Sequence, residues 1–373
     1  MGLLRVLLAL SVVLAHLGGI GGYQIAGGLA AVQMFYVISG FYMATILTEK
    51  YDPRADRDVF YFNRFLRIYS VYFVCLVISL VLYYVMHVRG SPGWWQNVAD
   101  STAKLDFSAK AAEVIAALFV FGQDVLLFFK IEDGGLVFTA NGITGVAPSD
   151  QPWMLQPIPQ AWTISLELMF YCIVPFLIRA KTTTLITIAA ISLLARAVTY
   201  SAGYDGEPWI YRFFPFELAL FVVGMIARRI YDAHIDKIAR QTQVVIAAVF
   251  VAAAFLVQPL SEATDSRTVV IWTYYASALI GLPCLFQLTR NIKIDNAVAD
   301  FSYPIYLIHW IVIVFYDSIY GDMGDWAAVP LVRVAICVAV TIAISGAIVV
   351  AVETPINRIR QRRIAAAQTA RAS

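Results

Sequence analysis

The sequence predicts an all-α integral membrane protein, a polytopic bundle of ten transmembrane helices. Of its 373 residues, 60% are hydrophobic and 14% are charged, whereas a soluble domain carries about 25% charged residues. The mean hydropathy is +0.73, and apolar runs long enough to span a bilayer recur along the whole chain. This composition excludes a soluble globular enzyme, a disordered chain and a typical nucleic-acid-binding protein.

Eleven apolar runs are candidates for membrane helices. They comprise residues 3–17, 29–47, 69–88, 113–130, 163–178, 183–199, 213–227, 243–258, 270–288, 303–319 and 328–351. The first run resembles a signal peptide, because one basic residue lies near its start and Gly18 and Gly19 follow it. His16 within the run, and the many spans after it, favour a retained first helix.

The distribution of Lys and Arg decides which runs cross the membrane. If the N-terminus is cytoplasmic and 113–130 does not cross, 19 of these residues lie on the cytoplasmic side and 7 outside. If 113–130 does cross, the counts become 10 and 16. The positive-inside rule favours the first arrangement. We therefore predict ten spans, two cytoplasmic termini, and a re-entrant or interfacial helix at 113–130, where Gln123 and Asp124 suit a segment that does not face lipid throughout.

The remaining organisation is simple. Residues 1–357 read as one transmembrane domain, and 358–373 as a basic cytoplasmic tail that anchors on anionic lipid. The longest external stretch, 89–161, is rich in Gly and Pro towards its end, and we expect it to fold as a lid over the external mouth. The four cysteines all lie in apolar runs and form no CxxC pair, which indicates free thiols.

Ionisable residues within spans are costly and are candidates for function. Arg5 and His16 are eleven residues apart, so they share one helix face about 16 Å apart along the axis. Histidine can accept a proton near neutral pH. The structural alternatives are a cytoplasmic anchor for Arg5 and a helix–helix hydrogen bond for His16.

Two further sets of charged residues stand out. Glu167 is predicted just inside the external end of its span, at a depth similar to that of His16, and a carboxylate can orient an imidazole. A buried ion pair between helices is the alternative. Arg64 and Arg67 are three residues apart on one face, and paired guanidinium groups suit phosphates. The alternative for them is the ordinary positive-inside bias.

Several segments together resemble the integral-membrane acyltransferase-3 superfamily, over essentially the whole chain. The matching residues are Arg5-x10-His16, Phe35 to Phe41 with Ser39-Gly40, Arg64-x2-Arg67 with Tyr69, Trp162-x4-Glu167 with Phe170-Tyr171, Ser302 to His309 with Tyr303, and Glu353-Thr354-Pro355. Members of this family O-acylate glycans and some other acceptors, and ten spans are typical of them. This chain has Ser70 where the family often has Pro, and Thr163 where it often has Ser.

The resemblance implies a catalytic scheme. Arg5, Arg64 and Arg67 would hold the phosphates of acyl-CoA on the cytoplasmic side. His16 would either deprotonate the acceptor hydroxyl directly or carry the acyl group first, and Glu167 would orient it. The first route predicts a ternary complex and the second an acyl-enzyme. Further pocket candidates are Ser39, Tyr69, Trp162, Ser302, Tyr303 and His309.

The resemblance also implies the partners. The donor would be acyl-CoA, most commonly acetyl-CoA, and the acceptor an exopolysaccharide, O-antigen or lipid-linked sugar of a polysaccharide assembly pathway in a bacterial inner membrane. We expect no permanently bound cofactor, no metal site and no nucleic acid partner. A proton-coupled transporter or a flippase of a lipid-linked glycan is the competing interpretation, although inverted repeats typical of such carriers are not evident in the sequence.

Overall fold

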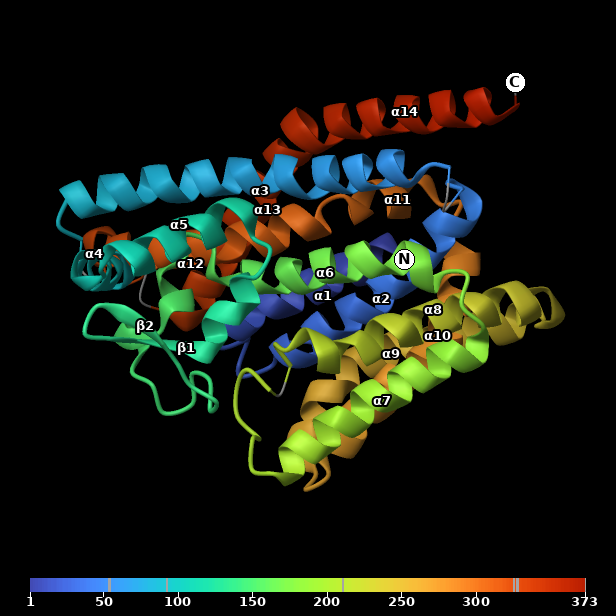
Figure 1. Cartoon of the computed structure of the whole chain (residues 1–373), viewed down its shortest axis with the longest axis horizontal. Coiled ribbons are helices and arrows are strands. Elements are labelled where there is room, and N and C mark those ends of the chain that lie inside the picture. The colour runs from blue at the N-terminus through green and yellow to red at the C-terminus, as the bar shows by residue number, and fades with distance from the viewer. Residues whose placement is uncertain (53–54, 92, 210, 325, 327–328, 373) are drawn as a thin grey trace.

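The computed structural model is a bundle of long helices that run side by side (Figure 1), and it describes residues 1–52, 55–91, 93–209, 211–324, 326 and 329–372. The α-helices are α1 (Gly2–Leu17), α2 (Gly28–Glu49), α3 (Arg57–Val88), α4 (Trp94–Lys104), α5 (Phe107–Phe119), α6 (Trp162–Leu177), α7 (Thr182–Ser201), α8 (Phe214–His234), α9 (Arg240–Ala263), α10 (Arg267–Thr289), α11 (Lys293–Ala299), α12 (Ser302–Met323), α13 (Pro330–Ile348) and α14 (Thr354–Ala372). The short elements are 3₁₀-helices η1 (Gln123–Phe128), η2 (Pro148–Asp150), η3 (Pro152–Leu155), η4 (Pro159–Ala161) and η5 (Ile235–Lys237), a π-helical turn η7 (Val349–Glu353), and an antiparallel hairpin of β1 (Phe129–Glu132) and β2 (Gly135–Phe138).

The all-α prediction is confirmed, and each of the ten predicted spans corresponds to one long helix. Within the described residues, eight helical segments are long and apolar enough to cross a bilayer. Helix α1 is shorter, at 16 residues, and α8 carries four charged side chains, so the count of ten remains a prediction. Helix α3 begins at Arg57, twelve residues before the predicted span, because no helix-breaking residue interrupts it.

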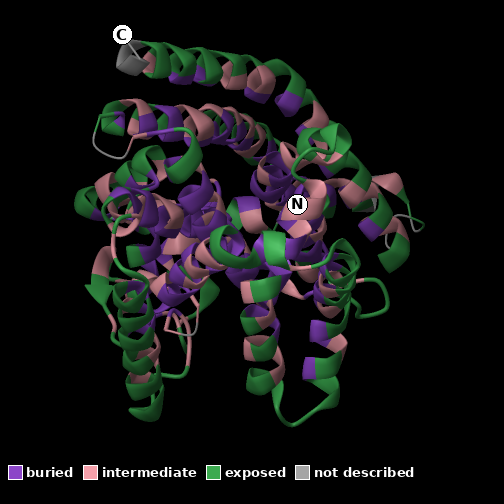
Figure 2. Cartoon of the chain, turned by 90° about the vertical axis from the view of Figure 1, so that its right-hand side faces the viewer, coloured by how far each residue is buried: buried purple, intermediate pink, exposed green. Residues whose placement is uncertain are grey.

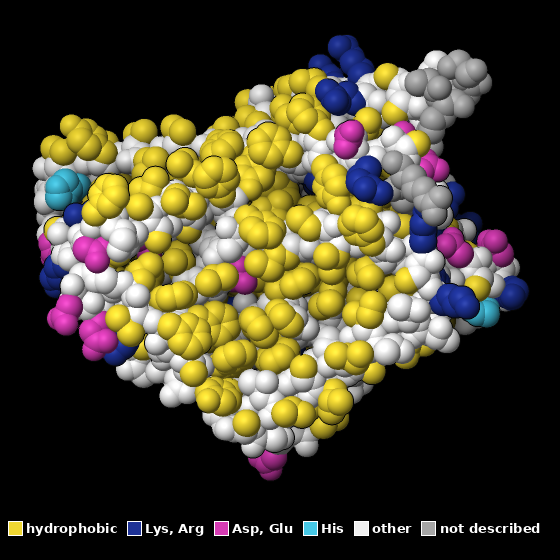
Figure 3. Space-filling model, in the orientation of Figure 1, with side chains coloured by type: hydrophobic (Ala, Val, Ile, Leu, Met, Phe, Trp, Pro, Cys, Tyr) yellow, Lys and Arg dark blue, Asp and Glu magenta, His cyan; other side chains and the backbone are white. Residues whose placement is uncertain are grey.

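The surface and the termini agree with a membrane protein. Hydrophobic side chains cover the middle of one face, and most charged side chains gather at its two ends (Figure 3). The start of α1 and the end of α14 lie towards the same end of the bundle, opposite α4 and the β-hairpin (Figure 1). Viewed from the end that holds the termini, buried residues gather in the inner helices, and the outer helices are largely exposed (Figure 2).

Close backbone contact joins α2 and α8 at the centre of the bundle. A Cβ atom on Gly40 would lie 1.9 Å from the carbonyl oxygen of Phe221, and one on Gly224 would lie 1.9 Å from that of Val37. Small residues allow helices in membranes to approach in this way. In the Ser39-Gly40 pair, Gly40 therefore allows this close helix packing.

The segment predicted as one helix at 113–130 is different in the structure. Helix α5 ends at Phe119, Val120 has a positive φ of 61°, and the chain continues as η1 and β1. The backbone N–H of Asp106, before α5, donates to the carbonyl oxygen of Gly134, in the β-hairpin, at 2.9 Å. The chain thus doubles back, and the prediction of one continuous helix is wrong because a residue in the left-handed region interrupts the α-helical backbone.

Hydrogen bonds hold this doubled-back segment against α6. The Ser165 hydroxyl donates to a carboxylate oxygen of Asp124 at 2.6 Å and accepts from the backbone N–H of Gly122 at 2.8 Å. The Gln123 amide donates to Gln156 at 2.8 Å. The polar residues that set this segment apart in the sequence are therefore buried against protein.

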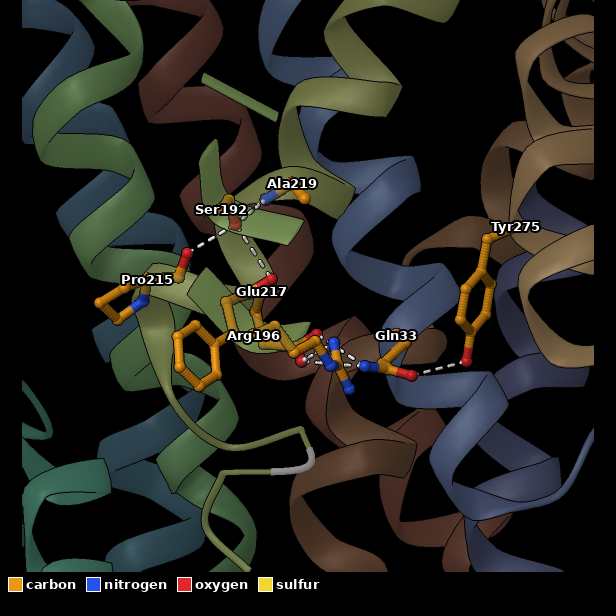
Figure 4. A network of polar contacts seen from close by, with 8 residues as sticks. Gln33, Ser192, Arg196, Pro215, Glu217, Ala219 and Tyr275 are labelled. Atoms are coloured by element: carbon orange, nitrogen blue, oxygen red, sulfur yellow. Dashed lines mark hydrogen bonds and ion pairs between the residues drawn. The ribbon is translucent and has the colours of Figure 1, made fainter. Parts of the chain in front are cut away.

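A buried polar network joins α2, α7, α8 and α10 (Figure 4). The carboxylate of Glu217 is fully buried and accepts from Arg196 at 3.1 Å and from the Gln33 amide at 2.9 Å. The Tyr275 hydroxyl donates to the Gln33 side-chain oxygen at 2.7 Å. The network fixes one face of α2, whose other side lines the cavity described next.

Candidate functional site

A cavity of about 660 Å³ lies inside the bundle and reaches the end where the chain begins, because Met1 is part of its wall. Helix α2 lines it from Val32 to Glu49, and Lys50 continues the wall. At 1.5 Å per residue this stretch is about 27 Å long. Side chains of α1, α3, α6, α10, α11, α12 and α14 and of the segments between them complete the wall. The cavity is therefore a deep channel that α2 follows over most of its length.

Positive charge dominates the cavity. Six Arg or Lys side chains and three Asp or Glu side chains line it: Arg5, Lys50, Arg64, Arg67, Arg290, Arg360, Glu49, Glu167 and Asp300. Glu49 is paired with Arg228, which does not line the cavity, at 2.9 Å. Within the described residues, Arg5, Arg64, Arg67 and Arg360 form no salt bridge with a carboxylate.

The individual guanidinium groups have few polar partners. Arg64 is 3% exposed; among the described residues its Nε has no hydrogen-bond partner, and the partner of its Nη1 is the Met43 sulfur at 3.9 Å. The Arg5 guanidinium lies 5.8 Å from the centre of the Tyr42 ring. Removing an unpaired cation from water costs several kcal/mol. A bound anion would supply the missing partners.

Glu167 lies in the cavity wall, but it does not orient His16. Its carboxylate accepts hydrogen bonds from the Ser39 hydroxyl, at 2.8 Å, and from the Tyr171 hydroxyl. Within the described part of the chain, no hydrogen bond joins Glu167 to His16. The predicted pairing is therefore replaced by one within the cavity, because α6 turns Glu167 towards α2.

His16 instead pairs with the second membrane histidine. Its side chain is exposed at the end of α1, with its ring 5.2 Å from that of His309 and 5.3 Å from that of Trp310. His309 is fully buried, and its Nδ1 lies 2.7 Å from the carbonyl oxygen of Tyr306. Because a carbonyl only accepts, Nδ1 carries the hydrogen and Nε2 the lone pair. Neither histidine lines the cavity.

Tyr306 lies between the cavity and the two histidines. It is part of the cavity wall, and its ring centre lies 5.9 Å from that of His309. The Thr163 hydroxyl donates to the Tyr306 hydroxyl at 2.9 Å, which in turn donates to the Gln160 carbonyl at 3.2 Å. The inner end of the cavity is therefore closed by a hydrogen-bonded tyrosine next to the histidine pair.

The other pocket candidates divide into two groups. Ser302 and Tyr303 line the cavity, and the Tyr303 hydroxyl donates to the Ile68 carbonyl at 3.1 Å. Tyr69 and Trp162 do not line it. The Tyr69 hydroxyl donates to the carbonyl of Phe119 in α5, and Trp162 packs against Tyr211 and the Arg212 guanidinium. Both therefore lie where helices pack, outside the predicted pocket.

Three cavity cations were not predicted from the sequence as site residues: Lys50, Arg290 and Arg360. Arg360 lies in the predicted tail, yet it is 6% exposed and lines the cavity. The tail begins as α14 at Thr354 and packs beside α3 (Figure 1). The only signal in the sequence was spacing, because Arg360 and Ile364 are one turn apart and share a helix face.

The fold and the cavity define a polytopic membrane protein with a deep cationic channel at one end and a histidine pair beyond its closed inner end. The chain belongs to the acyltransferase-3 family: the family model described as an acyltransferase domain matches residues 1–350. It is thus a membrane acyltransferase. No curated protein and no solved structure matches the chain significantly.

Proposed function

We propose that this acyltransferase takes an acyl group, acetyl in the simplest case, from acyl-CoA and transfers it to a hydroxyl of a glycan or glycolipid. The observation that carries the proposal is that Arg5, Arg64 and Arg67 line one deep cavity and form no salt bridge among the described residues. Coenzyme A has a pyrophosphate and a ribose phosphate, and guanidinium groups bind phosphate oxygens in pairs.

The shape of the cavity suits the rest of the donor. With the phosphates among the arginines, the pantetheine arm extends along α2, past Ser39 and Glu167, towards the aromatic inner end at Phe35 and Tyr306. The hydroxyl of Ser39 and the carboxylate of Glu167 offer hydrogen bonds to the amides of the arm. The thioester then lies next to the tyrosine that separates the cavity from the histidine pair.

His16 is the proposed base. The acceptor oxygen attacks the thioester carbon, a C–O bond forms, and the C–S bond breaks, so that the CoA thiolate leaves with the electron pair. His16 takes the hydroxyl proton, which then neutralises the thiolate. The Nε2 lone pair of His309 faces no hydrogen-bond partner among the described residues, and it can accept from an N–H of His16 and orient it, in place of Glu167.

In the second route, Tyr306 moves aside, and His16 attacks the thioester carbon first and holds the acyl group. The acceptor hydroxyl then attacks the acyl-imidazole, the C–N bond breaks, and the imidazole regains its lone pair. Initial-rate patterns distinguish the routes, because only the acyl-enzyme route gives parallel double-reciprocal lines.

We propose that the cavity opens to the cytoplasm of a bacterium and that both termini lie on that side of its inner membrane, where acyl-CoA is made.

The test is release of free CoA from acetyl-CoA by the purified protein in nanodiscs, with a crude glycan extract as acceptor. Wild type should release CoA in the presence of extract, and His16→Ala should lose at least about 99% of that rate, as expected for loss of a general base. His87→Ala is the matched control, because His87 is an exposed histidine at the end of α3. It should retain the wild-type rate.

Two outcomes would contradict the proposal. Equal rates in wild type and a folded His16→Ala variant would remove His16 from the mechanism. Absence of CoA binding to wild type would remove the donor assignment. The transporter interpretation would then be favoured, because a carrier of glycans consumes no acyl-CoA.

A further inference from the structure

Helix α14 contacts the bundle at several points between its start and Gln368. It follows the π-helical turn η7, and the Arg363 guanidinium lies 4.1 Å from the centre of the Phe62 ring of α3. Near its end, the Gln368 amide donates to the Lys50 carbonyl at 3.4 Å. The helix is therefore held over the end of the cavity formed by α2 and α3.

One face of α14 points into the cavity. Arg360 and Ile364 are 6% and 8% exposed and line it, whereas Arg358, Arg362 and Arg363 are exposed. A helix that only attached to anionic lipid would present its arginines to the lipid surface. Arg360 alone among these four arginines is turned inward.

The buried guanidinium of Arg360 lacks an anionic partner. Its Nη1 donates to the side-chain oxygen of Asn357, one turn earlier, and its Nε has no hydrogen-bond partner in the part of the chain that the structure describes. Within the described residues it forms no salt bridge with a carboxylate. Burying a cation in this way costs free energy unless a ligand supplies the missing anionic partner.

The cations at this end of the cavity are crowded. Burial lowers the pKa of the Lys50 ammonium, Glu49 raises it in part, and the charges of Arg360, Arg64 and Arg67 each lower it. Positive charges from three separate elements are thus close enough to repel each other. A ligand with several negative charges would relieve the repulsion.

We propose that α14 is part of the donor site and that Arg360 binds a phosphate of acyl-CoA together with Arg64 and Arg67. This inference rests on the proposed function, and it extends the site beyond the 350 residues that define the family match. The same guanidinium could bind the phosphate of a lipid headgroup, and the experiment separates the two sources.

The experiment measures CoA binding to the full-length protein in nanodiscs of zwitterionic lipid. Loss of one charge-assisted contact should weaken binding by about 10- to 100-fold in Arg360→Gln. Arg360→Lys should recover part of it, because a lysine retains the charge but not the planar fork. Arg362→Gln removes the same charge from the exposed side of the same helix, and should change the dissociation constant by less than about 2-fold.

Thermal unfolding without ligand provides the control for folding. Because Arg360 is an unpaired buried cation, Arg360→Gln should unfold at the same or a higher temperature than wild type, which a structural role would not give. Repeating the CoA titration with an added anionic phospholipid tests the other source. Competition that depends on Arg360 would assign the site to lipid and overturn the proposal.

The remaining outcomes are also decisive. Wild-type affinity in Arg360→Gln, or equal weakening in Arg360→Gln and Arg362→Gln, would overturn the role of α14 while leaving the proposed function intact. Failure of wild type itself to bind CoA would overturn both.

Discussion

Replacing Gly40 by alanine should push α2 away from α8. The added Cβ would lie 1.9 Å from the Phe221 carbonyl oxygen, and real Cβ contacts shorter than 3.0 Å are essentially never seen. The helices must therefore separate by about 1 Å or more. Overpacking of this kind lowers the free energy of unfolding by about 1–3 kcal/mol. We expect the upper end of this range, because the atom in the way belongs to the backbone and cannot rotate aside.

The assay is thermal unfolding of the purified protein, together with CoA binding. Gly346→Ala is the matched control, because Gly346 is also helical and its added Cβ would lie 3.4 Å from the nearest atom, an edge carbon of Phe301. Gly40→Ala should unfold at a lower temperature than Gly346→Ala. It should also bind CoA more weakly, because Ser39 lies next to Gly40 and holds Glu167 in the cavity.

A Gly40→Ala protein as stable as Gly346→Ala would refute the argument that backbone contact sets the distance between α2 and α8. Lower stability with unchanged CoA binding would refute only the second step, the coupling of this contact to the cavity.

Two other predictions follow from buried or crowded charges. Glu217→Ala leaves Arg196 without its carboxylate, so it should destabilise the protein by about 3–5 kcal/mol in equilibrium unfolding; a change below about 1 kcal/mol would contradict the role of this network. The pKa of Lys50 is lowered in the free protein, so between that value and the ordinary value near 10.5 the side chain is partly neutral. A bound polyphosphate raises the pKa of Lys50 again, and CoA binding at pH 9 to 10 should therefore take up protons. Calorimetry in buffers of different ionisation enthalpy measures this proton uptake. The Lys50→Gln substitution should abolish the uptake.

Much of the fold could be predicted from local patterns. Hydropathy located the helices that correspond to the ten predicted spans, because the length of a span is fixed by the thickness of the bilayer; it did not locate the polar helix α14. Charge indicated that 113–130 does not cross, and Asp106 and Gly134, which flank this segment, are joined by a backbone hydrogen bond in the structure. Its internal break at Val120 was not predicted, because the residue is an ordinary valine whose backbone is set by its surroundings.

The candidate site was predicted in part. Residues of one helix, such as Arg64 and Arg67, keep the spacing that the helical repeat gives them, so their convergence on one cavity could be anticipated. Contacts between side chains of different helices could not be anticipated from the sequence. Glu167 was expected beside His16, but it bonds Ser39, and His309 takes the place beside His16.

The sequence by itself therefore determined the class of protein, the long helices, the family and the guanidinium pair of α3, because hydrophobic length and helical periodicity are local properties. Only the tertiary structure decided which polar side chains share a cavity, that Tyr306 closes its inner end, and that Arg360 of the C-terminal helix faces inward. The physical reason is that these contacts depend on the rotation and depth of each helix against its neighbours, which packing across the whole bundle sets.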